Sequence, residues 1–368
     1  MSWAKLRAAT GKYNCFLKYN FSLTIPQGIS ATTLDPKNYK VKKMMKKLLP
    51  LAILLGAMGT AHAELAVYGL VDISYGKNEL LPGAAGTEGA RIHSGGDDNA
   101  SQGNSTTRVG LKGSTDIGSG LKANFKLETG GIDRDLRIGK ENKAFFHRQA
   151  WAGLSGSFGE VRFGRQDSVP FQMMGAYDFN GQANAATALG NSGVAAWGRG
   201  RQTQSLQYIS PSMNGVTAHV GFAGKEDGVD NAKAASSAGL TYAAGKFSVS
   251  VVGETKRTDG GENFAGVAGS YDFGVVKVMA SYADGGTNAK GTGLGFVAPV
   301  AGFNVGMHYG KNSDTNAAAT ELFVNREIFK NTYAYADYGY LDNNNAPSNK
   351  AYAVGVIYVF DIKLSGGR

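Results

Sequence analysis

Residues 145–166 read FFHRQAWAGLSGSFGEVRFGRQ, and this stretch decides the fold because it predicts two short strands folded back through a Gly/Ser turn. On the second strand, Val161 and Phe163 alternate with polar and charged neighbours, so one face is apolar and the other is charged. The segment that follows, residues 167–200, shows no sustained period. Long structureless segments in compact proteins are usually functional or disordered. The stretch therefore predicts a β-rich chain with one candidate functional loop.

Alternation with a period of two residues recurs throughout the chain after residue 63, whereas no window there shows a convincing helical stripe of apolar residues. The clearest example is Leu121–Glu128, in which Leu, Ala, Phe and Leu alternate with Lys, Asn, Lys and Glu. Counting the weaker runs as well gives about sixteen strands. The sequence therefore predicts an all-β fold.

An even strand number of this size is typical of a 16-stranded antiparallel transmembrane β-barrel, whose closed ring pairs every backbone group and whose outer face is apolar. Tight turns at 114–120 and 156–159 alternate with long polar connections at 78–104 and 130–144, which is the loop pattern of such barrels. A soluble sandwich would alternate too. However, the polar faces carry Lys, Arg and Glu, and the apolar faces end in aromatic residues, which favours the barrel.

The formal net charge of +9 is distributed unevenly. Residues 1–63 hold ten Lys and Arg and one acidic residue, and subtracting these from the totals of 38 and 29 leaves 28 basic and 28 acidic residues in 64–368. A neutral body gives no electrostatic basis for binding nucleic acid. The single cysteine, Cys15, precedes the body, so residues 64–368 form no disulfide and no thiolate metal site.

Residues 44–63 have the features of a secretory signal peptide, with two lysines, the apolar run LLPLAILLGAMG and the ending Ala61-His62-Ala63. We expect cleavage after Ala63, since the apolar run of about 12 residues is shorter than the roughly 20 that a membrane-spanning helix needs. Because a signal normally begins a chain, we interpret residues 1–43 as a mis-assigned upstream extension. A genuine cytoplasmic extension is the alternative. Export of a cysteine-free body is compatible with a Gram-negative envelope protein.

Four motifs carry a family resemblance: Tyr68-Gly69-Leu70-Val71-Asp72; Arg108-Val109-Gly110-Leu111-Lys112-Gly113 with Gly120-Leu121-Lys122-Ala123; Arg148-Gln149-Ala150-Trp151-Ala152-Gly153-Leu154; and Phe163-Gly164-Arg165-Gln166. Together they make residues 64–360 resemble the general diffusion porins of the Gram-negative outer membrane. The resemblance implies a homotrimer of 16-stranded barrels in contact with outer-membrane lipids and lipopolysaccharide. It also implies that residues 167–200 fold inward and narrow a water-filled channel, through which ions and small hydrophilic solutes diffuse passively.

The resemblance further implies inward basic side chains that face acidic groups on the folded loop. The residues predicted for this pore constriction are Arg108, Arg148, Arg201, Lys112, Arg162 and Asp178. Strand alternation independently sends Arg108 and Lys112 inward, but on the Arg148 strand it leaves Gln149 and Trp151 together on the outer face. The alternative for each arginine is a rim residue paired with a loop carboxylate. From the arginines we expect a mild anion preference.

Porins of this type end on an aromatic residue, which is Phe360 here, whereas this chain continues for eight residues to Arg368. We expect residues 361–368 to form an atypical tail that masks the terminal aromatic and hinders membrane insertion.

Other classes of function find little support in the sequence. The histidines have no zinc-binding spacing, and Gly291-Thr292-Gly293-Leu294-Gly295 fits a strand better than a nucleotide-binding loop, so we expect no metal, no cofactor and no enzyme activity. Two alternatives to a general pore remain, namely an adhesin or receptor surface and a substrate-specific channel. The position of residues 167–200 discriminates, because a loop inside the lumen indicates a pore.

Overall fold

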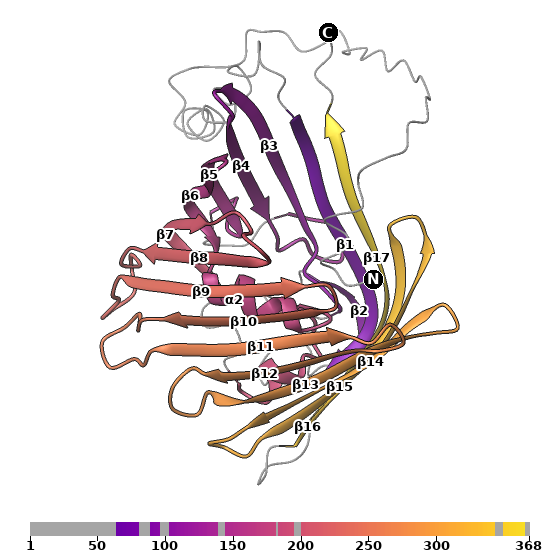
Figure 1. Ribbon diagram of the computed structural model, residues 1–368. Coiled ribbons are helices and arrows are strands. Elements are labelled where there is room, and N and C mark those ends of the chain that lie inside the picture. The colour runs from indigo at the N-terminus through magenta and orange to yellow at the C-terminus, as the bar shows by residue number, and fades with distance from the viewer. Residues whose placement is uncertain are drawn as a thin grey trace, which may run out of the picture. The chain divides into compact units, whose positions relative to one another are not determined.

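The computed structural model describes residues 64–80, 89–95, 103–138, 144–181, 183–194, 200–342 and 349–364. Within these residues seventeen strands form a single antiparallel sheet (Figure 1). The expected upstream extension, the signal peptide and residues 365–368 lie outside the described residues. Among the described residues the first strand begins at Glu64.

The strands follow one another along the chain, joined by alternating tight and long connections. They are β1 (Glu64–Asn78), β2 (Arg91–Ser94), β3 (Arg108–Gly118), β4 (Leu121–Thr129), β5 (Gln149–Gly156), β6 (Gly159–Asp167), β7 (Arg201–Ile209), β8 (Val216–Ala223), β9 (Ala235–Ala244), β10 (Phe247–Glu254), β11 (Phe264–Asp272), β12 (Lys277–Asp284), β13 (Lys290–Val300), β14 (Phe303–Asn312), β15 (Ala318–Phe329), β16 (Thr332–Asp342) and β17 (Asn349–Leu364).

The sheet closes on itself because β1 pairs with β17 on one side and with β3 on the other. From β3 to β17 each strand pairs with its neighbours in the sequence. The short strand β2 pairs with β1 at Ile73–Gly76, beyond the point where the β1–β3 pairing ends at Leu70. β2 and β3 therefore share one place beside β1, and the barrel has the sixteen strand positions that the sequence predicted.

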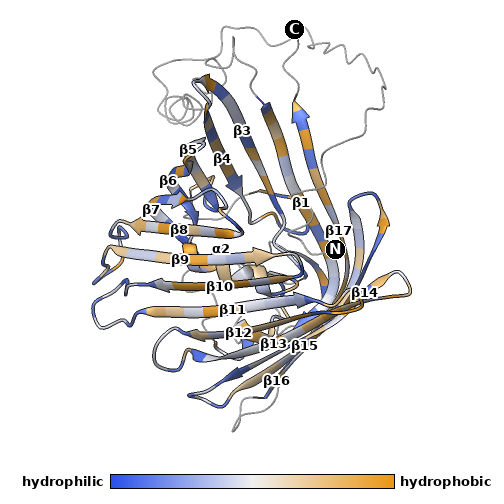
Figure 2. Cartoon of the chain, in the orientation of Figure 1, coloured by the Kyte–Doolittle hydropathy of each residue, from blue (hydrophilic) through white to orange (hydrophobic). Residues whose placement is uncertain are grey.

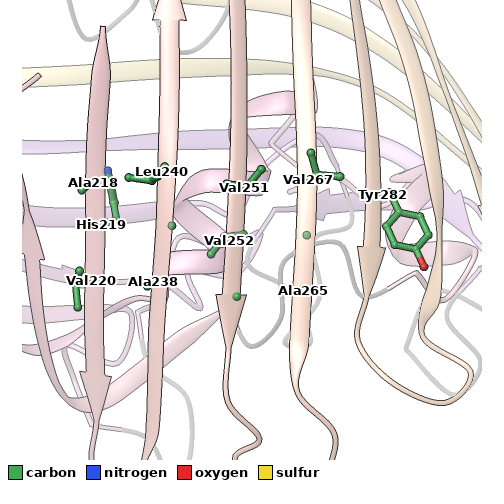
Figure 3. Close-up of a pocket in the computed structure, with 13 residues that line it drawn as sticks. Ala218, His219, Val220, Ala238, Leu240, Val251, Val252, Ala265, Val267 and Tyr282 are labelled. Carbon is green, nitrogen blue, oxygen red and sulfur yellow. The ribbon is translucent and has the colours of Figure 1, made fainter. Parts of the chain in front are cut away.

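The two faces of the barrel wall differ in the way the alternation predicted. On β10 the apolar Val251 is 47% exposed on the outer face, whereas its polar neighbour Ser250 is 2% exposed on the inner face. This difference arises because apolar and polar residues alternate along the strands (Figure 2). On the outer wall across β8–β12, Ala218, Ala238 and Ala265 lie among larger apolar side chains and leave a shallow apolar depression (Figure 3). An apolar outer face suits contact with lipid chains.

The last strand runs four residues beyond Phe360, where the sequence analysis ended the barrel. β17 continues to Leu364, and residues 361–364 pair with residues 65–68 of β1. Asp361 also forms an ion pair of 2.6 Å with Lys112 of β3. Residues 361–364 are therefore part of the wall and not a tail, because the long β1 offers them backbone partners. Among the described residues, no helix is both long and apolar enough to cross a membrane.

Candidate pore constriction

The long segment after β6 folds into three short helical elements. These are α2 (Val169–Met174), the 3₁₀-helix η4 (Gly175–Tyr177) and α3 (Ala188–Asn191). Ser168 starts α2, since its Oγ accepts a hydrogen bond of 3.1 Å from the backbone N–H of Phe171, and Pro170 suits the first turn. α2 packs against β8–β11 and α3 against β13–β16, and both helices lie inside the curve of the sheet (Figure 1). We call residues 167–200 the inner loop.

Glycines on the inner wall make room for the inner loop. The inward glycines in contact with it are Gly221, Gly239, Gly266, Gly291, Gly293, Gly310 and Gly339. A Cβ atom on Gly310 would lie 2.7 Å from the carbonyl oxygen of Ala188, and one on Gly339 would lie 3.0 Å from the Cα of Ala186. At other glycines a buried side chain of the loop takes the space of the missing Cβ, as Met173 does at Gly239 and Met174 at Gly266. The missing side chains thus allow the loop backbone to approach the wall closely.

Polar contacts fix the far half of the inner loop to β14 and β15. The imidazole Nδ1 of His308 lies 2.9 Å from Oδ2 of Asp178. The side-chain amides of Asn180 and Asn184 donate hydrogen bonds of 2.7 and 2.6 Å to the same oxygen of Glu321. All five side chains are buried. Because charged and polar groups buried from water need such partners, these contacts hold the loop at one place on the wall.

A basic cluster lies on the opposite side of the barrel, where the inner loop begins. Nε of Arg148 lies 2.7 Å from Oε1 of Glu128, and Nε of Arg108 lies 3.9 Å from the other oxygen of this carboxylate. Nε of Arg201 lies 3.1 Å from Oδ1 of Asp167. Arg108 and Arg148 thus share one carboxylate, and Arg201 lies close enough for its charge to be repelled by both. We call these five residues the arginine cluster.

Glu128 is the centre of this cluster and was missed by sequence reasoning. It is 4% exposed and also accepts a hydrogen bond of 2.9 Å from the hydroxyl of Tyr68. Nζ of Lys126 lies 4.0 Å from the same carboxylate and 5.3 Å from the centre of the Tyr68 ring. Glu128 ends the most clearly alternating strand, so its polar face was predictable. Its meeting with Arg148 depends on the long connection between β4 and β5, which alternation does not describe.

Two of the predicted basic residues lie outside the arginine cluster. Lys112 is four residues from Arg108 along β3, or about 13 Å, and pairs with Asp361. Arg162 forms an ion pair with Glu160 and stacks at 4.6 Å on the ring of Trp151. Both side chains extend the basic lining of the inner wall toward the tight turns. They do not join the three arginines at the base of the inner loop.

The structure resolves the conflict over Arg148 and its neighbours. In the register of β4 and β5, Gln149 lies opposite Glu128, and Trp151 lies opposite Lys126, so both face inward. The expectation that they share the outer face was wrong. Arg148 precedes β5, which begins at Gln149, and therefore its side chain is not bound by strand alternation.

Asp178 does not take the predicted position across the pore from the arginines. Its side chain is 1% exposed and is directed to His308 on the barrel wall. The expected role fails because Asp178 belongs to the contacts that fasten the loop. The inner loop contains one other acidic residue, Asp167, which is paired with Arg201.

These positions leave an asymmetric channel interior. The helices of the inner loop cover the β8–β11 and β13–β16 side, whereas the arginine cluster belongs to β3–β7. A closed sixteen-stranded barrel with an apolar outer face, a charged inner face and a loop against its inner wall defines a membrane channel protein. A family model described as Gram-negative porin matches residues 51–346, and the chain belongs to this family. It is thus an outer-membrane porin and not an enzyme.

Individual relatives agree with this assignment. The chain is 31% identical to outer membrane porin protein 32 of Delftia acidovorans over 351 residues, which cover 85% of this chain and 94% of the relative. It is 33% identical to an outer membrane porin protein of Bordetella pertussis over 275 residues, covering 65% and 69%. A solved structure described as an anion-selective porin from Comamonas acidovorans has a TM-score of 0.66 and 25% identity, and the match covers 81% of this chain and all of the other.

Proposed function

We propose that this porin is a passive diffusion channel with a mild anion preference, whose narrowest part lies between the inner loop and the arginine cluster. One observation carries the preference: the inner loop offers no free carboxylate to the water of the channel. Its acidic residues are Asp167 and Asp178, of which the first is paired with Arg201 and the second is buried against His308. Free carboxylates on the loop would offset the positive potential of the arginines. The paired Asp167 and the buried Asp178 offset it only weakly.

The charge near the constriction supports the same direction. Three arginines and Lys126 contribute four positive charges, whereas Glu128 and Asp167 contribute two negative ones. The local excess is positive although residues 64–368 are neutral overall. Local potential rather than net charge decides which ions pass through a narrow channel. The solved structure described as an anion-selective porin is consistent with this preference.

Two rival functions fit the structure less well. An adhesin or receptor would expose its longest loop, whereas here the inner loop packs against the inner wall. A sugar-specific channel would need a line of accessible aromatic side chains along the lumen. Instead, Tyr68 donates its hydroxyl hydrogen to Glu128, and Tyr335 is buried and donates to Asp72 over 2.7 Å. Both tyrosines are therefore held by hydrogen bonds to side chains of the barrel wall and do not form an accessible aromatic path.

Reversal potentials in a KCl gradient across a planar bilayer test the proposal. We expect the wild-type channel to favour Cl⁻, and we expect Arg148→Ala to shift the potential toward cation preference. Arg137→Ala is the matched control, because Arg137 is 75% exposed and pairs with Asp133 and Asp135 in the connection after β4. Cation preference in the wild type, or an equal shift in both variants, would refute the assignment.

The proposal includes a homotrimer embedded in outer-membrane lipid and lipopolysaccharide. Support comes from the family and from the extensive apolar outer wall. Light scattering in detergent, combined with electrophoresis of unheated and heated samples, measures the assembly. A mass of one chain in mild detergent would contradict the trimer.

A further inference from the structure

A buried polar cluster beneath the inner loop is separate from the arginine cluster. Asp178, His308 and Glu321 each offer one ligand atom, and these atoms all lie within 4.8 Å of one another. The three residues are 5%, 3% and 1% exposed. They come from the inner loop, β14 and β15, so the cluster joins the loop to two strands of the wall.

A third carboxylate adjoins this cluster. Asp337 on β16 is 5% exposed, and neither of its oxygens accepts a hydrogen bond of normal geometry. It faces inward beside Glu321, and the charges of the two carboxylates act on each other. Asn184 connects them, since its side chain bonds to Glu321 and also lies against Asp337. The side-chain oxygens of Asn180 and Asn184 are likewise buried without a donor.

The charge of the cluster is unbalanced. If all three carboxylates were ionised they would carry three negative charges, whereas a protonated His308 would supply a single positive charge. Burying unpaired charge costs several kcal/mol per ion, so such a group needs either protons or a cation. The buried oxygens without a donor belong to Asp337, Asn180 and Asn184, whereas the oxygens of Glu321 accept hydrogen bonds from Asn180, Asn184 and the backbone N–H of Ala188. Carboxylate oxygens beside an imidazole are donors that a divalent transition-metal ion uses.

We propose that Asp178, His308 and Glu321 bind a divalent transition-metal ion, with Asp337 completing the negative environment. One imidazole and two carboxylates are a donor set that Zn²⁺ accepts at about 2.0–2.2 Å. In a tetrahedral site with bonds of this length the ligand atoms lie about 3.3–3.6 Å apart, so the three side chains would move together by up to about 1 Å when the ion binds. The ion would tie the inner loop to the wall.

Sequence reasoning predicted no metal site because it searched for ligands close together in the sequence. Asp178 and His308 are 130 residues apart, and closure of the barrel together with the folding of the inner loop brings them together. No short spacing could therefore indicate the site.

Retention of zinc by the folded, full-length mature protein tests the proposal. Protein from outer membranes is stripped with a chelator, incubated with Zn²⁺ and dialysed, and the metal is counted by mass spectrometry. We expect about one zinc per chain in the wild type. We expect zinc binding to be at least about tenfold weaker in His308→Gln and Glu321→Gln. His219→Gln is the matched control, since His219 lies on β8 outside the cluster, and it should retain the wild-type amount.

Two results would overturn the proposal: a wild type that retains no zinc, or His308→Gln that retains as much as the wild type. If the variants do not fold, X-ray absorption of the zinc-loaded wild type replaces them. One nitrogen and two or more oxygens at about 2.0–2.2 Å are expected there. A spectrum without imidazole scattering would equally refute the site.

Discussion

Replacing Glu128 by glutamine should strengthen the anion preference of the channel. The change removes the carboxylate that Arg148 contacts at 2.7 Å and that Arg108 and Lys126 approach at 3.9 and 4.0 Å. Glutamine has nearly the same shape, and its amide oxygen still accepts the hydrogen bond from Tyr68. The variant therefore changes charge with little change in the width of the pore.

The size of the effect follows from Coulomb's law. At a distance of about 8 Å in water, one unit charge changes the energy of a passing monovalent ion by about 0.5 kcal/mol. Screening at 0.1 M salt, where the Debye length is about 10 Å, roughly halves this value. Because an anion gains and a cation loses this energy, the ratio of Cl⁻ to K⁺ permeability should rise about twofold, or up to about fivefold if the effective dielectric constant is half that of water.

The assay is the reversal potential in a KCl gradient, measured for wild type, Glu128→Gln and the control Glu160→Gln. Glu160 is a suitable control because it pairs with Arg162, away from the arginine cluster. Some loss of thermal stability is expected, but less than the about 3–5 kcal/mol for breaking a fully buried pair, since the side chains of Arg108 and Arg148 are 26% and 14% exposed. An unchanged or more cation-selective Glu128→Gln channel of normal conductance would refute the reasoning.

Three other outcomes are expected. Gly310→Ala should displace the inner loop and change single-channel conductance, because its Cβ would lie 2.7 Å from the backbone of Ala188. The control Gly253→Ala, whose Cβ would have no neighbour nearer than 3.7 Å, should leave the conductance unchanged, and equal conductance in both variants would contradict the prediction. Truncation after Phe360 should lower the melting temperature on heated electrophoresis, since four backbone pairs with β1 are lost, and an unchanged temperature would show that these pairs contribute nothing. Amino-terminal sequencing of protein from outer membranes should begin at Glu64; recovery of residues 1–43 would show that no signal is removed.

The barrel was predictable because alternation is a local property that each strand carries by itself. Leu121–Glu128 was expected as a strand, and the structure has β4 at Leu121–Thr129. The same alternation assigned Arg108 to the inner face. The end of the barrel was misplaced at Phe360 because the pairing of residues 361–364 depends on the length of β1 at the other end of the chain.

The site was less predictable because its contacts join distant residues. The three arginines were proposed through the family resemblance; in the structure Arg108 and Arg148 share the carboxylate of Glu128, and Arg201 pairs with Asp167. Glu128 was missed because its partner Arg148 lies across a long connection. Asp178 was assigned to the pore because it is an acidic residue on the loop. The direction of a loop side chain depends on packing, which the sequence pattern does not show, and here Asp178 is bonded to His308 on the wall.

The pairing of β1 with β17 also has a consequence for the kinetics of folding. This ladder runs from Leu65 opposite Leu364 to Asn78 opposite Ala351 and joins strands that are separated by about 300 residues of chain. Bringing together segments so distant costs more chain entropy than forming any hairpin between neighbouring strands, and contacts of such long range fold slowly. We therefore expect hairpins to form first and the β1–β17 ladder to form in the final, rate-limiting step. Until that step both terminal strands present unpaired backbone edges, so the nearly closed barrel is the intermediate most exposed to aggregation.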